Sequence, residues 1–336
     1  MPRIGSNPYK GLTIEAYPGA ETTVVVITCI PNQEGYFAER VSILKLCLAS
    51  LIKNTDCPFN LMVVDNGCHK DVSRYLHELK QEGVIQILLG LARNIGKAPA
   101  QQLAFSCAPG KYIAYSDDDI FFHPGWLSRH LEIINTFPRA GMVGGQVRPN
   151  DIWHWSAPEV ARRYGVGIEE YVLPMEWIEH WAKSIDGSAS EILQYMETES
   201  IKNYHLSFNG VESFAGAPDY AFVLTKDVLC SPDIDLSQIC RSKKCMGGGV
   251  GGLPMALDRA GYLNLSTCKR LTDHIGNHLD DHWRQMATEL GVFVEEGRQV
   301  RAVSAEKASL GRRVFFRNRL ARRFWERVIP KILARI

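Results

Sequence analysis

The chain has 336 residues, of which 46% are hydrophobic and 22% are charged, and its formal net charge is +1. This length and composition suit a soluble globular protein with one large domain or two ordinary ones. The near-neutral charge argues against a nucleic-acid partner held by a general basic surface. No apolar run approaches the ~20 residues that a membrane-spanning helix needs.

Cysteine usage favours a reducing compartment. The chain has 9 Cys residues, an odd number without a CxxC pair, so a disulfide framework is not expected. The N-terminal stretch MPRIGSNPYKGLTIEAYPGAE lacks the apolar core of a signal peptide. We therefore expect a cytoplasmic location.

The first half of the chain alternates between buried strands and helices. Dense apolar runs predict strands, and apolar residues at helical spacing predict helices. The predicted strands are 22–30, 59–67, 84–90 and 111–116, and the predicted helices are 36–53, 73–83 and 96–107. This rhythm predicts an α/β fold with a mostly parallel central sheet flanked by helices.

The second half is less regular. Four of the 7 Trp residues lie in 151–206, among charged residues with helical spacing. Further strands are expected at 141–149 and 221–229, with a short helix that ends at Gly261 and a polar helix over roughly 279–290. We expect one composite domain with a helical, aromatic insert at 151–206.

Polar clusters follow the predicted parallel strands, where ligands of such sheets bind. A carboxylate at Asp65 can accept an N–H from a nucleobase, and Asn94 and Lys97 can meet a diphosphate, although Lys97 equally fits a solvated helix position. The clusters comprise Thr28, Ile30 and Pro31; Asp65, Asn66 and Gly67; Arg93, Asn94, Gly96 and Lys97; and Asp117, Asp118 and Asp119.

The three adjacent aspartates 117–119 raise a specific question, because neighbouring carboxylates repel one another unless a cation or hydrogen-bond donors offset the charge. One reading is a solvated turn or helix cap. The other is a hard-oxygen site for Mg²⁺ or Mn²⁺ that bridges the protein to a substrate's phosphates. The triplet alone leaves both readings open.

Several segments together resemble a known family. They are VVVITCIPN, VVDNG, ARNIGKAPAQQLA, YIAYSDDDIFFHPGW, and DRAGYLN with TDHIG. In order and spacing they resemble the family 2 glycosyltransferases with the GT-A fold, most strongly over 22–147. The resemblance implies a metal-dependent enzyme that moves a sugar from a UDP-, GDP- or dTDP-sugar to a hydroxyl of a glycan or lipid-linked acceptor.

The resemblance also implies roles for individual residues. Asp65 is expected to contact the base, and Asp117 and Asp119 to be the outer members of an Asp-x-Asp motif, with Asp118 between them. His274 in TDHIG is a plausible third metal ligand beside Asp117 and Asp119, since neutral imidazole binds such ions. The residues expected to line the nucleotide pocket are Arg93, Asn94, Gly96 and Lys97.

The general base is the departure from the family's pattern. Many members carry an acidic pair about twelve residues before the Gly-Tyr that corresponds to Gly261–Tyr262, but Gly249 and Val250 stand there. Three readings follow: a base from elsewhere, a retaining enzyme without one, or a protein that binds nucleotide sugar without efficient turnover. The candidate carboxylates are Asp258, Asp219 and Glu212.

A nucleotidyltransferase with a related sheet is a further alternative. Such an enzyme is expected to carry a Gly-rich, basic loop after the first strand, and TCIPNQEG is neither. The predicted division is an N-terminal extension 1–21, a nucleotide-sugar-binding half 22–150, an acceptor-side half 151–310 and a tail 311–336. The insert's Trp residues suit an acceptor, because aromatic faces pack against sugar C–H surfaces.

The tail is strongly basic. Residues 312–336 hold nine Lys or Arg and one acid, so the rest of the chain has 29 bases and 36 acids. Its apolar residues share a broad helical arc, which suits a helix lying in an anionic membrane interface. Docking to the acidic body and RNA binding are the rivals. We favour membrane binding by the tail and expect a peripheral protein on the inner face of the membrane.

Overall fold

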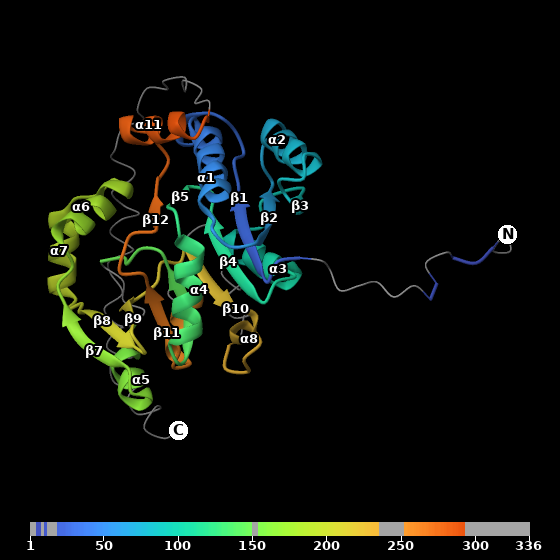
Figure 1. Ribbon diagram of the computed structural model, residues 1–336. Helices are drawn as coiled ribbons and strands as arrows, with labels where there is room; N and C mark the ends of the chain where they lie inside the picture. The colour runs from blue at the N-terminus through green and yellow to red at the C-terminus, as the bar shows by residue number, and fades with distance from the viewer. Residues whose placement is uncertain (1–4, 8–9, 12–18, 150–153, 235–251, 293–336) are drawn as a thin grey trace.

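A computed structural model of the protein describes residues 5–7, 10–11, 19–149, 154–234 and 252–292. These residues form a 10-stranded sheet of order β3-β2-β1-β4-β10-β6-β11-β9-β8-β7 and a two-stranded sheet of β12 and β5 (Figure 1). The strands are β1 (Thr22–Thr28), β2 (Phe59–Asn66), β3 (Ile87–Leu91), β4 (Tyr112–Asp117), β5 (Ile120–Phe122), β6 (Ala140–Gly144), β7 (Gly167–Tyr171), β8 (Asn203–Phe208), β9 (Val211–Ala215), β10 (Ala221–Thr225), β11 (Leu263–Ser266) and β12 (Thr272–His274). The helices are the 3₁₀-helix η1 (Gly35–Phe37), α1 (Arg40–Asn54), α2 (Lys70–Gln81), α3 (Lys97–Cys107), α4 (Trp126–Thr136), α5 (Ala157–Tyr164), α6 (Met175–Ser184), α7 (Ala189–Thr198), α8 (Lys226–Leu229), α10 (Leu253–Arg259) and α11 (Asp281–Glu289).

Most strands of the large sheet run in one direction. β3, β2, β1 and β4 are parallel neighbours, and β6, β11 and β8 share their direction. β10, β9 and β7 run the opposite way. The predicted α/β fold with a mostly parallel central sheet flanked by helices is confirmed.

The sheet is covered on both faces, which explains the unbroken apolar runs in its strands. Val24 and Val26 of β1 pack in a cluster with residues of α1, α2 and α4. Val25 and Ile27 point the other way and pack with residues of α3, α8 and α10. A third cluster joins α11 to the outer side of α1 (Figure 1). The parallel strands are therefore packed against helices on both faces.

The predicted elements of the first half are present, with shifted ends. Helix α2 begins at Lys70 rather than residue 73, because the side chain of His69 caps it by accepting a hydrogen bond from the backbone N of Asp71. Strand β3 begins later than predicted, at Ile87, because the backbone N–H groups of residues 84 and 85 close the end of α2 onto the carbonyl of Leu79.

The insert contains strands as well as helices. α5, α6 and α7 accompany β7 and β8, which form an antiparallel pair at one end of the large sheet. Of its four Trp residues, Trp155, Trp177 and Trp181 are described. Trp153, the pair Gly249–Val250 and the tail 311–336 lie outside the described residues.

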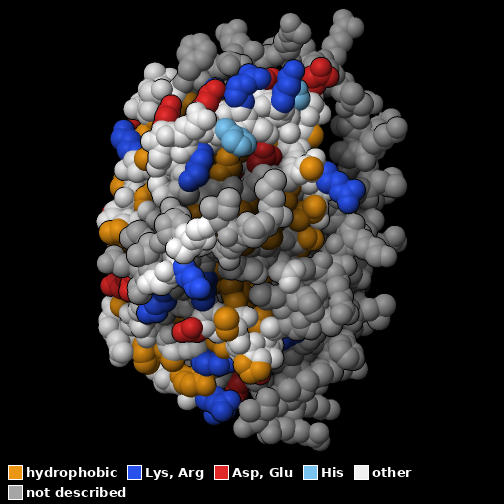
Figure 2. Space-filling view, turned by 90° about the vertical axis from the view of Figure 1, so that its right-hand side faces the viewer, with side chains coloured by type: hydrophobic (Ala, Val, Ile, Leu, Met, Phe, Trp, Pro, Cys, Tyr) orange, Lys and Arg blue, Asp and Glu red, His pale blue; other side chains and the backbone are white. Residues whose placement is uncertain are grey.

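Within the described ranges, no helix is long and apolar enough to cross a membrane. On the face shown in Figure 2, Lys and Arg side chains lie among Asp and Glu side chains, with apolar atoms between them. The described surface on this side therefore carries charges of both signs.

Candidate active site

The site lies where β1, β2, β3 and β4 end together. In the parallel register Thr28 pairs with Asp65 and Ile27 with Asp117, so the loops after these strands meet at one edge. Ile30 is buried, and its backbone N donates a hydrogen bond to Cys68 Sγ at 3.2 Å. Pro31 is exposed. The sheet topology thus places the polar clusters predicted from the sequence side by side.

Asp65 faces its own loop. Its side chain is buried, with Oδ1 accepting a hydrogen bond from the backbone N of Cys68 at 2.8 Å and Oδ2 accepting one from Ser73 Oγ. The carboxylate therefore fixes the turn between β2 and α2. A contact between Asp65 and a nucleobase stays a prediction.

Asn66 joins the loop after β2 to the loop after β3. Its Nδ2 donates to Asn94 Oδ1 at 3.1 Å, and its Oδ1 accepts from the backbone N of Ile95 at 3.0 Å. Asn94 Oδ1 also accepts from the backbone N of Gly96 at 2.7 Å, just before α3 begins. The two loops consequently form one unit, and the exposed side chain of Arg93 stands beside it.

Gly67 makes the close approach of these loops possible. Its φ is +78°, and a Cβ there would lie 2.4 Å from the backbone N of Asn94 and 2.5 Å from the backbone C of Arg93. A side chain at this position would collide with backbone rather than with a movable side chain. The turn after β2 therefore requires glycine for both space and backbone conformation.

The Asp117 carboxylate ends β4 and faces α3. Lys97 Nζ donates to its Oδ2 at 2.7 Å, and Tyr115 Oη donates to its Oδ1. Burial raises the pKa of Asp117, and Lys97 partly opposes this shift. Lys97 responds in the other sense: burial disfavours its charge, but Asp117 outweighs burial and raises the lysine pKa.

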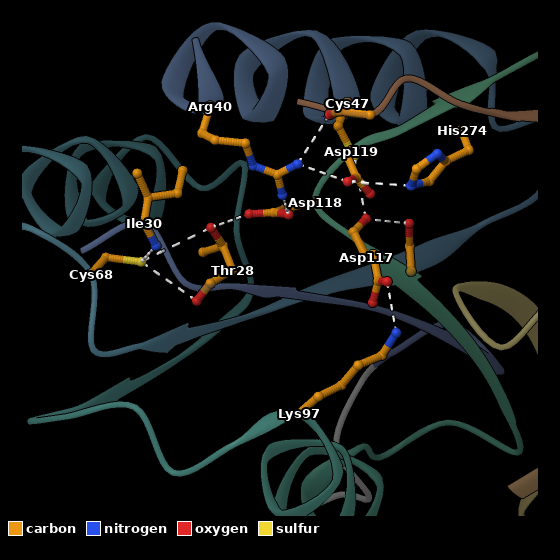
Figure 3. A network of polar contacts seen from close by, with 12 residues as sticks. Thr28, Ile30, Arg40, Cys47, Cys68, Lys97, Asp117, Asp118, Asp119 and His274 are labelled. Atoms are coloured by element: carbon orange, nitrogen blue, oxygen red, sulfur yellow. Dashed lines mark hydrogen bonds and ion pairs between the residues drawn. The ribbon is translucent and has the colours of Figure 1, made fainter. Parts of the chain in front are cut away.

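The Asp118 carboxylate turns to the opposite side. Its Oδ2 accepts a hydrogen bond from Thr28 Oγ1 at 2.6 Å, and its Oδ1 accepts one from Arg40 Nη2 (Figure 3). Burial raises the pKa of Asp118, while Arg40 opposes the shift. Arg40, the first residue of α1, is 8% exposed and was not predicted as a site residue. One sequence feature could have indicated it: Arg40 lies one helical turn before Leu44, on the apolar face of α1, where a charged residue needs a buried partner.

Asp119 lies between Arg40 and His274. Arg40 Nη1 donates to Asp119 Oδ2 at 2.7 Å, and His274 Nε2 is 3.5 Å from the same oxygen (Figure 3). Burial alone would raise the pKa of Asp119, but His274 and Arg40 outweigh it and hold the pKa well below its usual range. Burial would lower the pKa of His274, but Asp119 outweighs it and raises the pKa.

The second oxygen of Asp119 has no partner. Oδ1 is buried and makes no hydrogen bond, whereas both oxygens of Asp117 and of Asp118 are engaged. Within the described ranges, no three His, Cys, Asp or Glu side chains are arranged to hold a metal by themselves. An unpartnered carboxylate oxygen beside an imidazole nevertheless suits a divalent cation whose other ligands come from a substrate.

The three candidate bases occupy different environments. Asp258, in α10, is 2% exposed, and its Oδ1 accepts hydrogen bonds from Ser156 N at 3.0 Å and Ser156 Oγ at 2.7 Å. Glu212 is exposed on β9. Asp219 is exposed and paired with Arg148 at 3.2 Å, and the next residue, Tyr220, accepts a hydrogen bond through its carbonyl from Asp117 N. Only Asp219 is thereby placed at the acidic triplet.

Helix α6 links the insert to the triplet. Trp181 stacks on Tyr220 with ring centres 5.7 Å apart, and the Ser184 carbonyl lies 3.2 Å from His274 Nδ1. On another side of the helix, His180 pairs with Asp273 at 3.0 Å, next to a cavity of about 580 Å³. That cavity is lined by Glu176, Trp177, Glu179, His180, Lys183, Cys268, Lys269 and Arg270. No residue of the triplet lines it.

Residues 35–177 match the model of glycosyl transferase family 2. The predicted resemblance is confirmed for this segment, which is less than half of the chain. The family 2 segment contains Arg40, the loops after β2 and β3, Lys97 and the whole aspartate triplet.

Individual relatives add little detail. An uncharacterized glycosyltransferase of Rickettsia bellii (strain RML369-C) is 34% identical over 77 residues, which is 23% of this chain and 11% of that protein. The chain thus spans about a tenth of the length of the curated relative it matches.

Two solved structures are similar at a low level. TarS 1–349 of S. aureus has a TM-score of 0.40 and 11% identity, covering 75% of this chain and 59% of that one. The mannosyltransferase PcManGT from Pyrobaculum calidifontis, in complex with GDP-Man and Mn²⁺, has a TM-score of 0.40 and 14% identity, covering 78% and 58%. Scores this low carry no conclusion about the site.

Proposed function

We propose that the protein is a metal-dependent glycosyltransferase of the GT-A type. It moves a sugar from a nucleoside diphosphate donor to a hydroxyl group of a glycan or lipid-linked acceptor. The observation that carries the proposal is the acidic triplet at the end of β4, where Lys97 and Arg40 hold it and His274 meets Asp119. The family 2 segment around the triplet supports this reading.

The donor's nucleotide would lie along the unit formed by the loops after β2 and β3. Arg93 and Asn94 are exposed there, and Asn66 holds the loop through the side chain of Asn94 and the backbone N of Ile95. The start of α3 would receive the diphosphate, because backbone N–H groups and the helix dipole favour anions at that end. Lys97 is the first residue of α3 and would contribute its charge to the same group.

Asp119 and His274 are the residues best placed to hold Mn²⁺ or Mg²⁺. Asp119 Oδ1 is unpartnered, and His274 Nε2 lies 3.5 Å from the other oxygen of the same carboxylate, with Nδ1 of this ring beside the Ser184 carbonyl. Asp117, the third predicted ligand, would have to release Lys97 or Tyr115 in order to join them. A bound divalent cation would neutralise charge on the leaving diphosphate.

Asp219 is the general base that we propose for an inverting transfer. Partial desolvation by neighbouring residues would raise the pKa of this carboxyl group, but Arg148 and Lys97 outweigh it and lower the pKa, so the group is ionised at neutral pH. An ionised, exposed carboxylate can take a proton from an acceptor hydroxyl. Asp258 is less suited to this step because Ser156 holds it inside the protein.

The acceptor side would be formed by the second half of the chain, 151–310. The cavity beside α6 supports this placement, because it presents Trp177 together with acidic and basic side chains, a combination that can bind sugar faces and hydroxyls. The basic tail 311–336 would hold the protein at an anionic membrane, near a lipid-linked acceptor. The division of the chain into these parts is likewise a proposal.

A thermal-shift screen tests the donor half of the proposal. One of the UDP-, GDP- or dTDP-sugars, added with Mn²⁺, should raise the melting temperature, since a ligand that binds the native state stabilises it by mass action. Asp119→Asn should abolish the Mn²⁺-dependent part of the shift. Asp227→Asn, which changes an exposed carboxylate in α8, is the matched control. If the melting temperature of Asp119→Asn still rises with donor and depends on Mn²⁺ as in the wild type, the proposed metal site is wrong.

A further inference from the structure

Arg40 stands in the acidic triplet as a resident cation. Its Nη2 bonds Asp118, while its Nη1 bonds Asp119 at 2.7 Å and the Gly276 carbonyl at 3.1 Å. Figure 3 shows the side chain descending from α1 between the two carboxylates. The guanidinium group is buried with both partners. The family resemblance gives this residue no role.

The cations around the triplet nearly balance its charge. Lys97 contacts Asp117, Arg40 contacts both Asp118 and Asp119, and His274 also faces Asp119. Three carboxylates therefore meet two permanent cations and an imidazole. A divalent cation entering this group alone would gain little net charge attraction and would be repelled by Arg40.

We propose that Arg40 makes metal binding conditional on the nucleoside diphosphate. Arg40 prevents the triplet from retaining a divalent cation by itself, and the cation binds when a diphosphate brings its own negative charge. The inference rests on the proposed function, because it takes the nucleotide-binding edge and the Asp119–His274 pair as given.

Geometry supports the same conclusion independently of charge. While Arg40 is in place, only Asp119 Oδ1 is without a partner among the triplet's oxygens. Loss of the guanidinium group would release Asp118 Oδ1 and Asp119 Oδ2 together. A metal would then find several protein oxygens and would no longer need the diphosphate to complete its shell.

Titration of Mn²⁺, followed by the electron paramagnetic resonance signal of the free ion, tests this inference. In the wild-type protein, UDP or GDP should tighten Mn²⁺ binding by at least about tenfold. Arg40→Met and Arg40→Gln should bind Mn²⁺ without nucleotide at least about tenfold more tightly than the wild type. Arg40→Lys retains the charge but not the forked contacts, and should bind Mn²⁺ without nucleotide with an affinity between those of the wild type and the neutral variants. Arg162→Met, which removes an exposed arginine paired with Glu159, is the control.

The wild-type arm does not depend on how well the variants fold. Equal Mn²⁺ affinity with and without either nucleotide overturns the inference, even if the protein transfers sugar. Neutral variants that bind Mn²⁺ as weakly as the wild type overturn it as well. If no Mn²⁺ binds under any condition while a donor sugar is still turned over, the inference fails and transferase activity stands. If the protein neither turns over a donor sugar nor binds a nucleotide, the proposed function itself fails.

Discussion

Substitution of Gly67 by alanine should damage both stability and nucleotide binding. The new Cβ would meet the backbone of Asn94 and Arg93 at 2.4 Å and 2.5 Å, in a residue whose φ is +78°. Placing a non-glycine residue in left-handed backbone costs about 1–2 kcal/mol, and overpacking against structure that cannot move costs about 1–3 kcal/mol. Together the free energy of unfolding should fall by about 2–5 kcal/mol.

Two other glycines distinguish the cost of the left-handed backbone from the cost of the close contact. Gly83 has a φ of +77° with nothing near its Cβ position, so Gly83→Ala should cost about 1–2 kcal/mol. Gly90 has neither constraint, and Gly90→Ala should change stability by less than about 0.5 kcal/mol. Urea unfolding measures all three, and the donor-induced thermal shift measures binding. If Gly67→Ala is no worse than Gly83→Ala in both assays, the close contact between the loops is not what the site depends on.

Three further predictions concern the rest of the molecule. Burial lowers the pKa of His130 to about 4. His130 takes up a proton near pH 6.5 in the unfolded chain but not in the folded chain. The free energy of unfolding should therefore fall by about 2 kcal/mol from about pH 7 to about pH 5. In urea unfolding His130→Gln should reduce this slope, and an unchanged slope would refute the cause. Asp258→Ala leaves Ser156 without its acceptor and should lower stability by about 1–3 kcal/mol. Asp219→Asn should abolish sugar transfer with little effect on stability. If melting and transfer assays show the reverse pattern, Asp258 is the catalytic carboxylate and Asp219 the structural one. Truncation after Gly311 should release the protein from anionic vesicles in a sedimentation assay, and continued sedimentation would show that the tail is not the anchor.

The sequence could predict the donor half because its signals are local. The runs TTVVVIT and FNLMVVDN are apolar on both faces, as buried parallel strands must be, and each is followed by polar residues at the sheet edge. The positions of the triplet and of Asn66 and Lys97 follow from that rule. The edge strand β7 was missed, because GIEEY is mostly exposed and lacks an apolar face.

The contacts within the site could not be predicted in the same way. Arg40 meets Asp118 across 78 positions of the chain, and Thr28 meets it across 90. Such pairings depend on how α1 crosses the strand ends, which no local pattern encodes. Likewise, the position of Asp258 in the chain does not reveal that it is buried against Ser156, since that contact joins α10 to the insert.

Donor hydrolysis is the most direct test of the central claim, that the triplet after β4 activates a nucleotide sugar. The wild-type protein with Mn²⁺ should release nucleoside diphosphate from at least one of the UDP-, GDP- and dTDP-sugars. Asp119→Asn, once shown to melt at a temperature similar to that of the wild type, should release no nucleoside diphosphate above background. Equal release by both proteins, or no release from any donor that demonstrably binds the wild type, would contradict the account.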